Sequence, residues 1–592
     1  MKTFFKMLLA VVLGFIVTWV LLILFFLVVG VGLLASKDAA PKISSESVLH
    51  LDLNCAISER AVDNPFEKYS SPMFNQEKTM GLNTLSAMLK QAKNDDNIKG
   101  IYLDISNILV QSLTLATVEE LRNHLLDFKE SGKFIYCYST SLTQISYYLA
   151  SASDKIFLHP EGIIDLRGLS VQMMFFKKMF DKIDLDMQFI RHGTYKSGGE
   201  QYVLDKMSAA NKEQFQTYLN SVWNIMVSNI SKSRSIDEKI IQNTCDSLLL
   251  YADIKTALDR GFIDQFMYKD EFDAFIHSEL ELDSAKKINL VSAKDYRKTL
   301  PAAEIKKDKI AVIYAIGNII DTDDKGGKQS IGSSTAKEIA KARKDKNVKA
   351  VVLRVNSGGG SALTSDVIWR EVDLTRQVKP IVVSMGDYAA SGGYYISCAS
   401  SYIVAQPNTL TGSIGVFGLI PNAEKMLANK LGITIDRVKT NQHSDFGTIL
   451  RGLDNYERAV MQKIVEEVYS TFVKRVADGR KMTVSYVDSI GEGRIWAGAD
   501  ALRLGLVDTL GGLDIAIEKA AQLADISNYA ISERPALKDF FQEFLESFTD
   551  NKISSRMQKS NLYQTYSYFQ FVESALELKG VQARVPYLIP IY

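Results

Sequence analysis

The same pattern of segments occurs twice along this chain of 592 residues, and the duplication limits the possible folds more than any other feature. The first occurrence covers residues 47–291 and the second covers residues 309–530, at an offset of 244 to 250 residues. The matching pairs are Ile98–Ile105 with Val348–Val355, Lys133–Cys137 with Lys379–Val383, Tyr147–Tyr148 with Tyr394–Tyr395, and Ala257–Asp264 with Ala501–Asp508. Because the match runs from one end of each half to the other, we expect two copies of one domain.

In each half, β-branched runs typical of buried strands alternate with segments of helical periodicity. Such alternation calls for parallel strands joined by right-handed crossovers. We therefore predict an α/β fold with two tandem domains, the first over residues 47–300 and the second over residues 301–530. Residues 531–592 fall outside the repeat, and their many aromatic side chains suggest a helical extension that packs against the body of the protein or a neighbouring subunit.

The amino terminus carries an uncharged apolar run of 29 residues, Met7–Ala35. As a helix this run is about 43 Å long, which exceeds the roughly 30 Å hydrocarbon core of a bilayer. A cleaved signal peptide is the alternative, but its apolar core is usually about 7 to 15 residues long. We therefore predict that residues 1–46 form a retained transmembrane anchor and linker. Lys2 and Lys6 ahead of the run are expected to stay in the cytoplasm, which places the rest of the chain on the exported side.

The composition excludes several classes of function. Lys plus Arg (69) equals Asp plus Glu (69), so nothing predicts a nucleic acid or another polyanion as a partner. Apolar residues make up 46% of the chain, as expected of a globular protein rather than a disordered one. The four cysteines are far apart and form no Cys-x-x-Cys pair, so we expect no zinc or thioredoxin-type site. No motif calls for another metal or a cofactor.

The two halves differ where chemistry is expected. In the second half, a strand runs into Gly358–Gly360, which let the backbone approach a ligand and aim N–H groups at it, as an oxyanion hole requires. Ile108–Val110 stands at the aligned place in the first half and lacks this freedom. Ser391 lies among small residues at the expected start of a helix, whose positive end favours developing negative charge. The first half has Gln144 there, so only the second half offers a nucleophile.

A serine nucleophile needs a base, and the sequence favours a lysine over the more usual histidine. None of the six histidines has a suitable context, and the Gly-x-Ser-x-Gly elbow is absent around Ser391. Lys196 follows a predicted strand in the first half, whereas the aligned segment Thr440–Ser444 contains no lysine. One half thus keeps the lysine and the other keeps the serine. The role of base requires burial that lowers the lysine pKa toward about 7 to 8.

Each of these residues also has an ordinary structural interpretation. Ser391 is a candidate helix cap, Lys196 a candidate solvated loop lysine, and Gly358–Gly360 a candidate turn. Ser197 and Ser413 are weaker candidates for orienting the lysine, against ordinary loop hydrogen bonding.

Several stretches resemble the long-form signal peptide peptidases of the protease IV (SppA) type, which are membrane-anchored Ser/Lys proteases with the ClpP/crotonase-type fold. The most specific stretches are Gly193–Ser197, Tyr388–Ser397, Thr409–Gly418, Gly493–Asp500 and Gly505–Asp508. One departure is visible, because the family usually has Ser-Pro-Gly-Gly where this chain has Ser357 followed by three glycines. This difference makes the loop more flexible and leaves open which glycine donates to the oxyanion.

The resemblance implies Ser391 as nucleophile and Lys196 as general base, with the N–H groups of Gly359 and of Gly360 or Gly392 receiving the oxyanion. It also implies a homotetramer that degrades remnant signal peptides and other short hydrophobic peptides on the periplasmic side of the bacterial inner membrane. The sequence leaves open whether the pair forms within one chain or across two.

Two other functions stay open. An acyl-CoA enzyme of the same fold would want paired carboxylates near the glycine loop and no exported location, and the sequence meets neither expectation. An inactive membrane-tethered scaffold predicts that Lys196 and Ser391 are not in contact.

Overall fold

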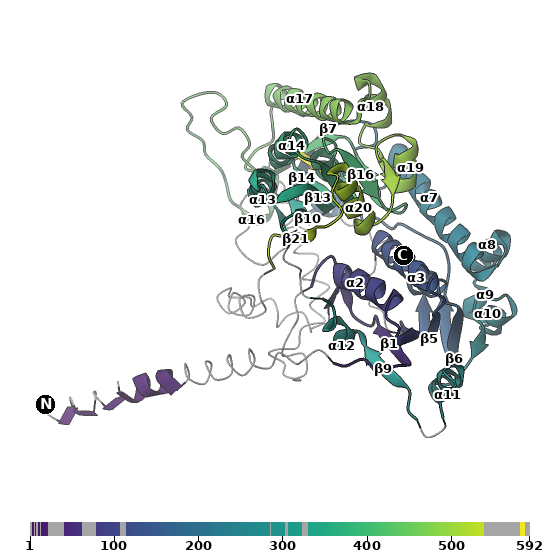
Figure 1. Cartoon of the computed structure of the whole chain (residues 1–592). Helices are drawn as coiled ribbons and strands as arrows, with labels where there is room; N and C mark the ends of the chain where they lie inside the picture. The colour runs from purple at the N-terminus through teal and green to yellow at the C-terminus, as the bar shows by residue number, and fades with distance from the viewer. Residues whose placement is uncertain are drawn as a thin grey trace.

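The computed structural model describes residues 3–4, 6–7, 10–11, 13–21, 41–61, 79–106, 114–283, 286–301, 306–321, 330–537 and 581–585. Within these ranges the chain forms two lobes, one from each half of the sequence, that lie against each other (Figure 1). None of the described helices is long and apolar enough to cross a membrane. Part of the predicted anchor, including residues 22–35, lies outside the described ranges, so the anchor stays a prediction.

The first lobe is built on a 6-stranded sheet with the order β8-β6-β5-β4-β1-β9, in which all neighbours are parallel. Its strands are β1 (Ser47–Asp52), β4 (Ile98–Asp104), β5 (Phe134–Thr143), β6 (Lys155–Asp165), β8 (Gln265–Phe266) and β9 (Asn289–Ser292), and a separate pair is formed by β2 (Ala56–Ser58) and β3 (Thr79–Gly81). The helices of this half are α2 (Leu82–Lys93), α3 (Leu115–Lys129), α4 (Gln144–Ala150), α5 (Lys177–Lys182), α6 (Glu200–Val203), α7 (Ala209–Arg234), α8 (Glu238–Ser247), α9 (Leu249–Ala252), α10 (Lys255–Asp259), α11 (Lys269–Glu279) and α12 (Ala293–Arg297).

Both faces of the first sheet are covered, which explains its nearly continuous apolar strands. Leu49 and Leu51 of β1 enter one hydrophobic cluster with residues of α2, α3 and α7. Val48 of the same strand enters a second cluster with Phe272 and Ile276 of α11. Alternate residues of a strand point to opposite faces, so a helix layer on each side is needed to bury both sets.

The second lobe repeats this plan. Its strands β21-β10-β13-β15-β16-β20 have the order of β9-β1-β4-β5-β6-β8, and β17 and β19 extend the sheet beside β15. The strands are β10 (Lys309–Ile316), β13 (Val348–Ser357), β15 (Ile381–Ala390), β16 (Tyr402–Ala405), β17 (Leu410–Gly412), β19 (Ile495–Ala497), β20 (Thr509–Leu510) and β21 (Ala530–Arg534). The helices are α13 (Ser333–Lys344), α14 (Ala362–Arg376), α15 (Gly392–Ser397), α16 (Glu424–Leu431), α17 (Asn455–Arg480), α18 (Val484–Ile490), α19 (Gly498–Arg503) and α20 (Leu513–Leu523). The α/β part of the fold prediction is confirmed.

The repeat extends to single hydrogen bonds. Tyr147 on α4 is fully buried and donates its hydroxyl to the carbonyl of Phe262 at 3.0 Å. Tyr394 on α15 is equally buried and donates to the carbonyl of Leu506 at 2.9 Å. Because a buried tyrosine hydroxyl needs a partner, these matched bonds fix the same helix against the same closing turn in each lobe.

A third sheet combines strands from both halves of the chain. Its order is β12-β11-β14-β22-β18-β7. The strands are β7 (Asp186–His192), β11 (Asn318–Ile319), β12 (Ser330–Ile331), β14 (Gly359–Ser361), β18 (Val416–Asn422) and β22 (Val581–Arg584). Although β7 belongs to the first half, it pairs with β18 of the second half along its whole length. Met187 of β7 is buried in one cluster with Phe417 and Leu419 of β18, which supplies the apolar driving force for this exchange.

The carboxyl-terminal segment also differs from the predicted helical extension of residues 531–592. β21 continues to Arg534 as the edge strand of the second sheet, because it pairs with β10. Residues 581–584 form a strand, β22, whose backbone groups pair with β14 on one side and with β18 on the other. Residues 538–580, which hold most of the aromatic side chains behind that prediction, lie outside the described ranges.

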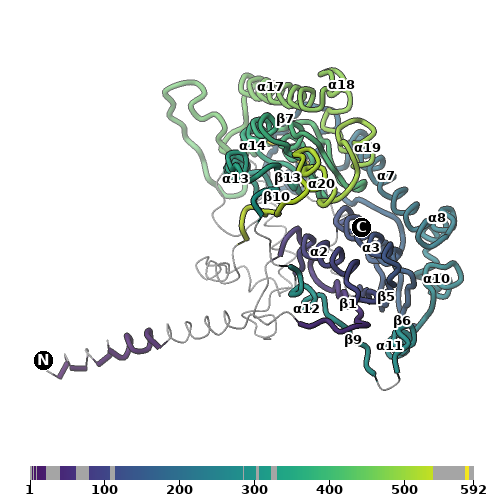
Figure 2. The backbone as a smooth tube through the Cα atoms, viewed as in Figure 1, coloured from purple at the N-terminus to yellow at the C-terminus, as the bar shows by residue number. Residues whose placement is uncertain are grey.

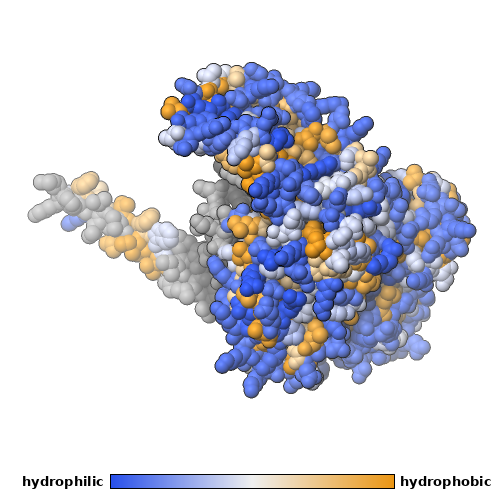
Figure 3. All heavy atoms as spheres, turned by 90° about the horizontal axis from the view of Figure 1, so that it is seen from above, coloured by the Kyte–Doolittle hydropathy of each residue, from blue (hydrophilic) through white to orange (hydrophobic). Residues whose placement is uncertain are grey.

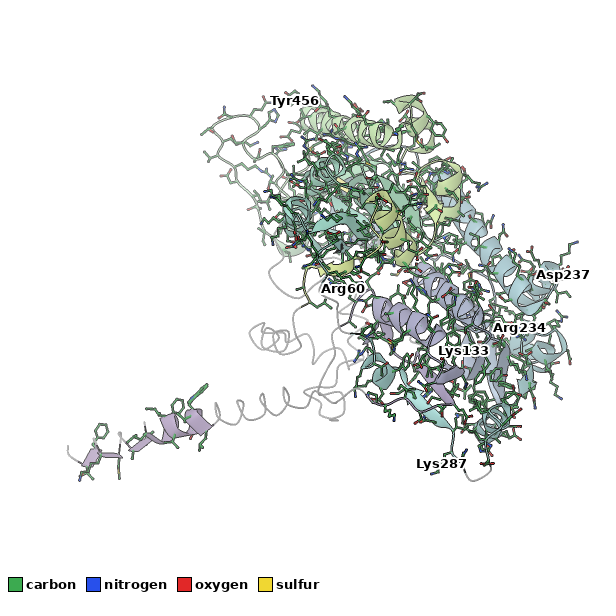
Figure 4. The ribbon with its side chains drawn as sticks, in the orientation of Figure 1. Arg60, Lys133, Arg234, Asp237, Lys287 and Tyr456 are labelled. Atoms are coloured by element: carbon green, nitrogen blue, oxygen red, sulfur yellow. The ribbon has the colours of Figure 1, made fainter. Side chains whose placement is uncertain are left out.

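Further contacts hold the lobes together. Helix α7 runs from β19 in the second lobe to α8 at the outer edge of the first (Figure 2). Arg60, at the junction of the lobes in Figure 4, places its guanidinium 4.1 Å from the centroid of the Tyr314 ring. The described turns of the amino-terminal helix instead project away from both lobes, and their Phe15 and Trp19 side chains are more than half exposed (Figure 3).

A buried ion triad crosses the same junction. Arg354 on β13 donates at 2.9 Å to Glu59 and at 2.9 Å to Glu120, both from the first half. All three side chains are at most 6% exposed. Burial raises the pKa of the Glu59 carboxyl, and the neighbouring guanidinium opposes that rise.

Replacing Arg354 with methionine is expected to cost about 3–5 kcal/mol of stability, because two buried carboxylates lose their counter-charge. The measurement is the urea midpoint of unfolding followed by tryptophan fluorescence. Arg370→Met is the matched control, since Arg370 is 57% exposed and pairs within its own helix, where an ion pair contributes less than about 1 kcal/mol. Equal midpoints for Arg354→Met and the parent would show that the triad does not hold the lobes together.

Candidate active site

Ser391 lies between β15 and α15 and is fully buried. Its backbone has φ 56° and ψ −116°, a strained conformation for a residue with a side chain. Its N–H donates to the carbonyl of Gly412 at 2.8 Å, which helps to hold the turn. The hydroxyl does not cap α15, so the structure does not support the interpretation of Ser391 as a helix cap.

Lys196 reaches this serine from the other half of the same chain. It follows β7, the strand that crosses into the third sheet, and its side chain is only 1% exposed. Its Nζ lies 2.7 Å from Ser391 Oγ, although the two residues are 195 positions apart. The structure therefore places Lys196 and Ser391 in contact within one chain, which the scaffold hypothesis did not predict.

Burial lowers the pKa of the Lys196 ammonium well below its usual value of 10.5. Desolvation is the cause, because removing the group from water penalises its charged form. The remaining partners of Nζ are neutral: the carbonyl oxygen of Ser413 at 3.1 Å and the Ser413 hydroxyl at 3.0 Å. A lysine in this setting gives up its proton more readily than a lysine in water, and the neutral amine can then accept a proton from a hydroxyl.

The two serines considered for orienting the lysine are placed differently. Ser413 contacts Lys196 Nζ through both its hydroxyl and its carbonyl. Ser197 does not join them, because its hydroxyl accepts a hydrogen bond from Gln214 at 3.1 Å. Consecutive residues of a non-helical segment direct their side chains apart, so a neighbour in sequence is poorly placed to reach Nζ. The suggestion that Ser197 orients the lysine is thus not supported by its contacts.

Two glycines that sequence reasoning left without a role let the lysine in. A Cβ on Gly493, whose φ is 80°, would lie 2.6 Å from the Cα of Lys196. A Cβ on Gly415 would lie 2.7 Å from the Cα of Gly493 and 3.1 Å from the Cδ of Lys196. The distances of 2.6 and 2.7 Å are too short for real atoms, so these backbones approach as closely as they do only because both residues are glycines. The signal in the sequence was their occurrence in family-specific stretches.

Of the three glycines predicted to form the oxyanion hole, Gly359 and Gly392 lie together and Gly360 lies apart. Gly359, with φ 98°, lies against Gly392, since a Cβ on Gly359 would be 2.7 Å from the Gly392 nitrogen. Gly360 lies in the sheet beside β11, opposite Ile319. The Gly359 N–H donates to the Ser357 hydroxyl at 3.1 Å. Gly359 and Gly392 are therefore adjacent to each other and to Ser391, while their role in binding an oxyanion stays a prediction.

Asp387 is a supporting residue that the sequence did not reveal. It lies four positions before Ser391 and accepts hydrogen bonds from the backbone N–H groups of Ala116 and Thr117 and from the Thr117 hydroxyl, at 2.9 to 3.1 Å. These donors belong to the amino-terminal end of α3 in the first half. The loop that carries Ser391 is thus fixed by the lobe that supplies Lys196.

A pocket opens next to the pair. It is lined by Tyr195, Ser197, Gln214, Phe215, Tyr388, Leu410, Ser413, Gly493, Ile495 and Val585. The lining is mainly apolar with a few polar groups, a composition suited to an apolar side chain of a bound peptide.

One group of possible metal ligands occurs in the described part of the chain, far from this pocket in sequence. The ligand atoms of His443, Asp454 and Glu457 lie within 4.8 Å of one another. Arg451 already donates to both Glu457 oxygens at 2.6 Å. The Arg451 guanidinium balances the charge of the Glu457 carboxylate, so the closeness of these three side chains needs no bound metal ion to account for it.

Comparison with known proteins decides the family. Residues 127–283 and 373–527 each match the family described as peptidase family S49. The chain belongs to peptidase family S49. Lys196 lies in the first matched segment and Ser391 in the second, so the family domain occurs twice, once around each residue of the pair.

The relatives of this S49 chain agree with that assignment. It is 36% identical to Protease 4 of Salmonella typhi over 463 residues, which are 77% of this chain and 73% of that protein. It is 33% identical to the chloroplastic serine protease SPPA of Arabidopsis thaliana over 456 residues, or 76% of this chain and 66% of that protein. The predicted membership in the protease IV (SppA) type is confirmed, and the chain is a serine peptidase.

Among solved structures, a ClpP1 mutant from Listeria monocytogenes aligns with 34% of this chain and 92% of its own, at 12% identity and a TM-score of 0.22. The ClpP/crotonase part of the fold prediction stays a prediction.

Proposed function

We propose that this S49 chain is a membrane-anchored endopeptidase that uses a Ser391/Lys196 dyad to degrade cleaved signal peptides and other short hydrophobic peptides on the exported side of the membrane. The observation that carries the proposal is the 2.7 Å contact between Lys196 Nζ and Ser391 Oγ in a fully buried setting. The apolar pocket beside the pair supports a hydrophobic substrate.

The hydrogen bonds around Nζ suit a neutral amine. Nζ lies within donating distance of Ser391 Oγ and of the carbonyl and hydroxyl of Ser413. Once neutral, the amine keeps two N–H groups for Ser413 and can turn its lone pair to the Ser391 hydroxyl. As Ser391 Oγ attacks a peptide carbonyl, Lys196 takes that proton. The carbonyl oxygen becomes negative and is received by backbone N–H groups near Gly359 and Gly392.

The second half of the reaction uses the same groups. The Lys196 ammonium returns its proton to the leaving amine as the peptide bond breaks and the acyl ester forms on Ser391. A water molecule then loses a proton to Lys196 and attacks the ester carbonyl. Lys196 returns that proton to Ser391 Oγ as the ester bond breaks and the acid product leaves.

The cellular setting rests on the sequence and the relatives. The apolar run Met7–Ala35 with Lys2 and Lys6 ahead of it favours an anchor in the bacterial inner membrane with the catalytic lobes in the periplasm. The homotetramer is proposed from the family resemblance. An enclosed assembly near the membrane would admit unfolded apolar peptides and keep folded proteins from Ser391.

Covalent trapping tests the dyad directly. The full chain in detergent micelles is expected to form a phosphonyl adduct with a fluorophosphonate, and peptide mass spectrometry should locate the adduct on Ser391. Lys196→Met is expected to react at least about a hundredfold more slowly, because the hydroxyl then lacks its base. An adduct on another serine, or equal rates for the parent and Lys196→Met, would rule out this dyad.

A further inference from the structure

A second cavity lies in the second lobe, where α14 and α17 end and β16 begins. Its volume is about 320 Å³, and its charged and hydroxyl-bearing lining residues are Arg376, Ser400, Ser401, Arg480, Lys481 and Asp508. The Ser401 hydroxyl accepts the N–H of Ile381, the first residue of β15, whereas Ser391 follows the last residue of the same strand. At about 3.3 Å per residue, β15 separates the cavity from Ser391 by about 30 Å.

The lining of this cavity is basic. Arg376, Arg480 and Lys481 are positive and Asp508 is negative, which gives a net charge of +2. Asp508 is turned to the protein, because its oxygens accept from Arg480 at 2.6 and 2.9 Å and from the Ile403 N–H at 2.7 Å. No described carboxylate forms an ion pair with Lys481. Like charges around one cavity repel each other, so an anion in it would be stabilised.

The first lobe offers a comparison, because the same framework of bonds is repeated there. Arg234, labelled in Figure 4, donates to Asp264 at 2.9 Å, as Arg480 donates to Asp508. The residue after each arginine has the same left-handed backbone, with φ of 55° in the first lobe and 56° in the second. The two places are therefore equivalent in structure as well as in sequence.

The side chains on this shared framework differ in charge between the lobes. Asp154 accepts the backbone N–H of Ile135 at 2.7 Å, as Ser401 accepts that of Ile381 at 3.3 Å. The aligned pairs that differ in charge are Glu130 with Arg376, Asp154 with Ser401, and Ser235 with Lys481. Together with the shared arginine and aspartate, these positions carry a net charge of −2 in the first lobe and +2 in the second. Every difference makes the second lobe more positive.

Ion pairs within each lobe do not remove this contrast. In the first lobe, Lys129 pairs with Asp154 at 2.9 Å and so balances one of the acids. In the second lobe, Asp373 is shared between Arg376 at 2.9 Å and Arg370 at 3.0 Å, so one carboxylate faces two guanidinium groups. The cavity of the second lobe thus keeps a surplus of positive charge.

We propose that this cavity binds a phosphate group, carried by a soluble phosphomonoester or by a lipid headgroup. The two guanidinium groups, the Lys481 ammonium and the Ser401 hydroxyl offer hydrogen-bond donors around one volume. A phosphate monoester carries a charge of about −1.5 to −2 at pH 7 and three acceptor oxygens, which matches this lining better than a carboxylate does. Arginine also binds phosphate through paired hydrogen bonds.

Binding of inorganic phosphate to the full chain in detergent micelles tests the proposal. Isothermal titration calorimetry at constant ionic strength is expected to show saturable binding. Ser401→Asp and Lys481→Ser each introduce the residue that the first lobe carries at the equivalent place, so the fold should tolerate them. Each is expected to weaken binding at least about tenfold, because a hydrogen bond to a charged group is lost or opposed. Lys463→Ser, which removes a 77% exposed lysine of α17, is the control and should match the parent.

Two further ligands distinguish the sources of the phosphate group. Glycerol 3-phosphate is the soluble probe, and phosphatidic acid added to the micelles is the lipid probe. Binding of glycerol 3-phosphate that is weakened in Ser401→Asp and Lys481→Ser assigns the cavity to soluble phosphomonoesters. Binding of phosphatidic acid alone, with the same loss in the two variants, assigns it to a lipid headgroup.

The proposal is overturned if the parent shows no saturable binding of any of these three ligands. It is equally overturned if Ser401→Asp and Lys481→Ser bind them as the parent does while melting at the same temperature in chloride. None of these measurements requires peptide hydrolysis, so the result is independent of the proposed peptidase function.

Discussion

Replacing Lys196 with methionine is expected to lower kcat/KM for a short apolar peptide by about 10³-fold or more, the range associated with loss of a general acid and base. Methionine fills a similar volume in the buried site but has no lone pair of comparable basicity. The comparison is made at matched concentrations of folded protein in detergent. Lys206→Met, which changes an exposed lysine, is the control and is expected to match the parent.

The pH dependence of kcat/KM is a second test of Lys196 as the base. In the parent, kcat/KM is expected to rise with pH as Lys196 loses its proton and to level off below pH 10.5, because burial lowers its pKa. Whatever activity Lys196→Met retains should not show that rise. A methionine variant with the full pH profile of the parent would mean that another group is the base.

The Lys196→Met substitution should raise the stability of the protein while it lowers the activity. Between the lowered pKa of Lys196 and its usual value of 10.5, the unfolded chain binds more protons than the folded chain, so the stability of the parent rises with pH across this window. Lys196→Met has no such cost. We therefore expect it to melt at a higher temperature than the parent at pH 7, and the difference to narrow as the pH approaches 10.5.

Replacing Ser391 with alanine is expected to remove essentially all turnover, a loss of about 10⁴-fold or more, because no acyl ester can form. Peptide affinity should remain, since the pocket beside Ser391 is unchanged. The measurement is single-turnover hydrolysis of a fluorogenic peptide alongside anisotropy of the same peptide. The strained backbone at this position, φ 56° and ψ −116°, is equally strained for alanine, so the fold should persist.

Ser400→Ala serves as the matched control, because Ser400 is a buried serine of the same lobe whose hydroxyl bonds only a nearby carbonyl. It is expected to retain activity within about twofold. Substantial turnover by Ser391→Ala, with Ser400→Ala unchanged, would show that the nucleophile is elsewhere.

The pairing of Lys196 with Ser391 could be inferred from sequence because the duplication supplies an internal comparison. A glycine run and a serine stand in one half where Ile108–Val110 and Gln144 stand in the other, and a lysine shows the opposite pattern. Loss of one function from each copy is visible without coordinates. The contact distance and the burial of the lysine are not, because they depend on how two distant segments dock.

The parts that the sequence did not reveal arise from contacts between distant segments. The strand at residues 187–191 was predicted, but its partner was not, since its apolar side chains fit either lobe. The preference for Ser413 over Ser197 depends on the direction in which each side chain leaves the backbone. The short strand β22 has little periodicity over its four residues and is held by two neighbours that only the tertiary fold brings together.

The pairing of β7 with β18 in the third sheet has a consequence for the evolution of the duplicated chain. A duplicated gene usually leaves a spare copy that is free to drift, but here each copy keeps one reactive group and has given up the other. A damaging substitution in either half inactivates the shared active site, so neither half can replace the other. The two halves then work as a single unit, and a substitution at a junction residue such as Arg354 or Asp387 acts on the same centre as one in either half.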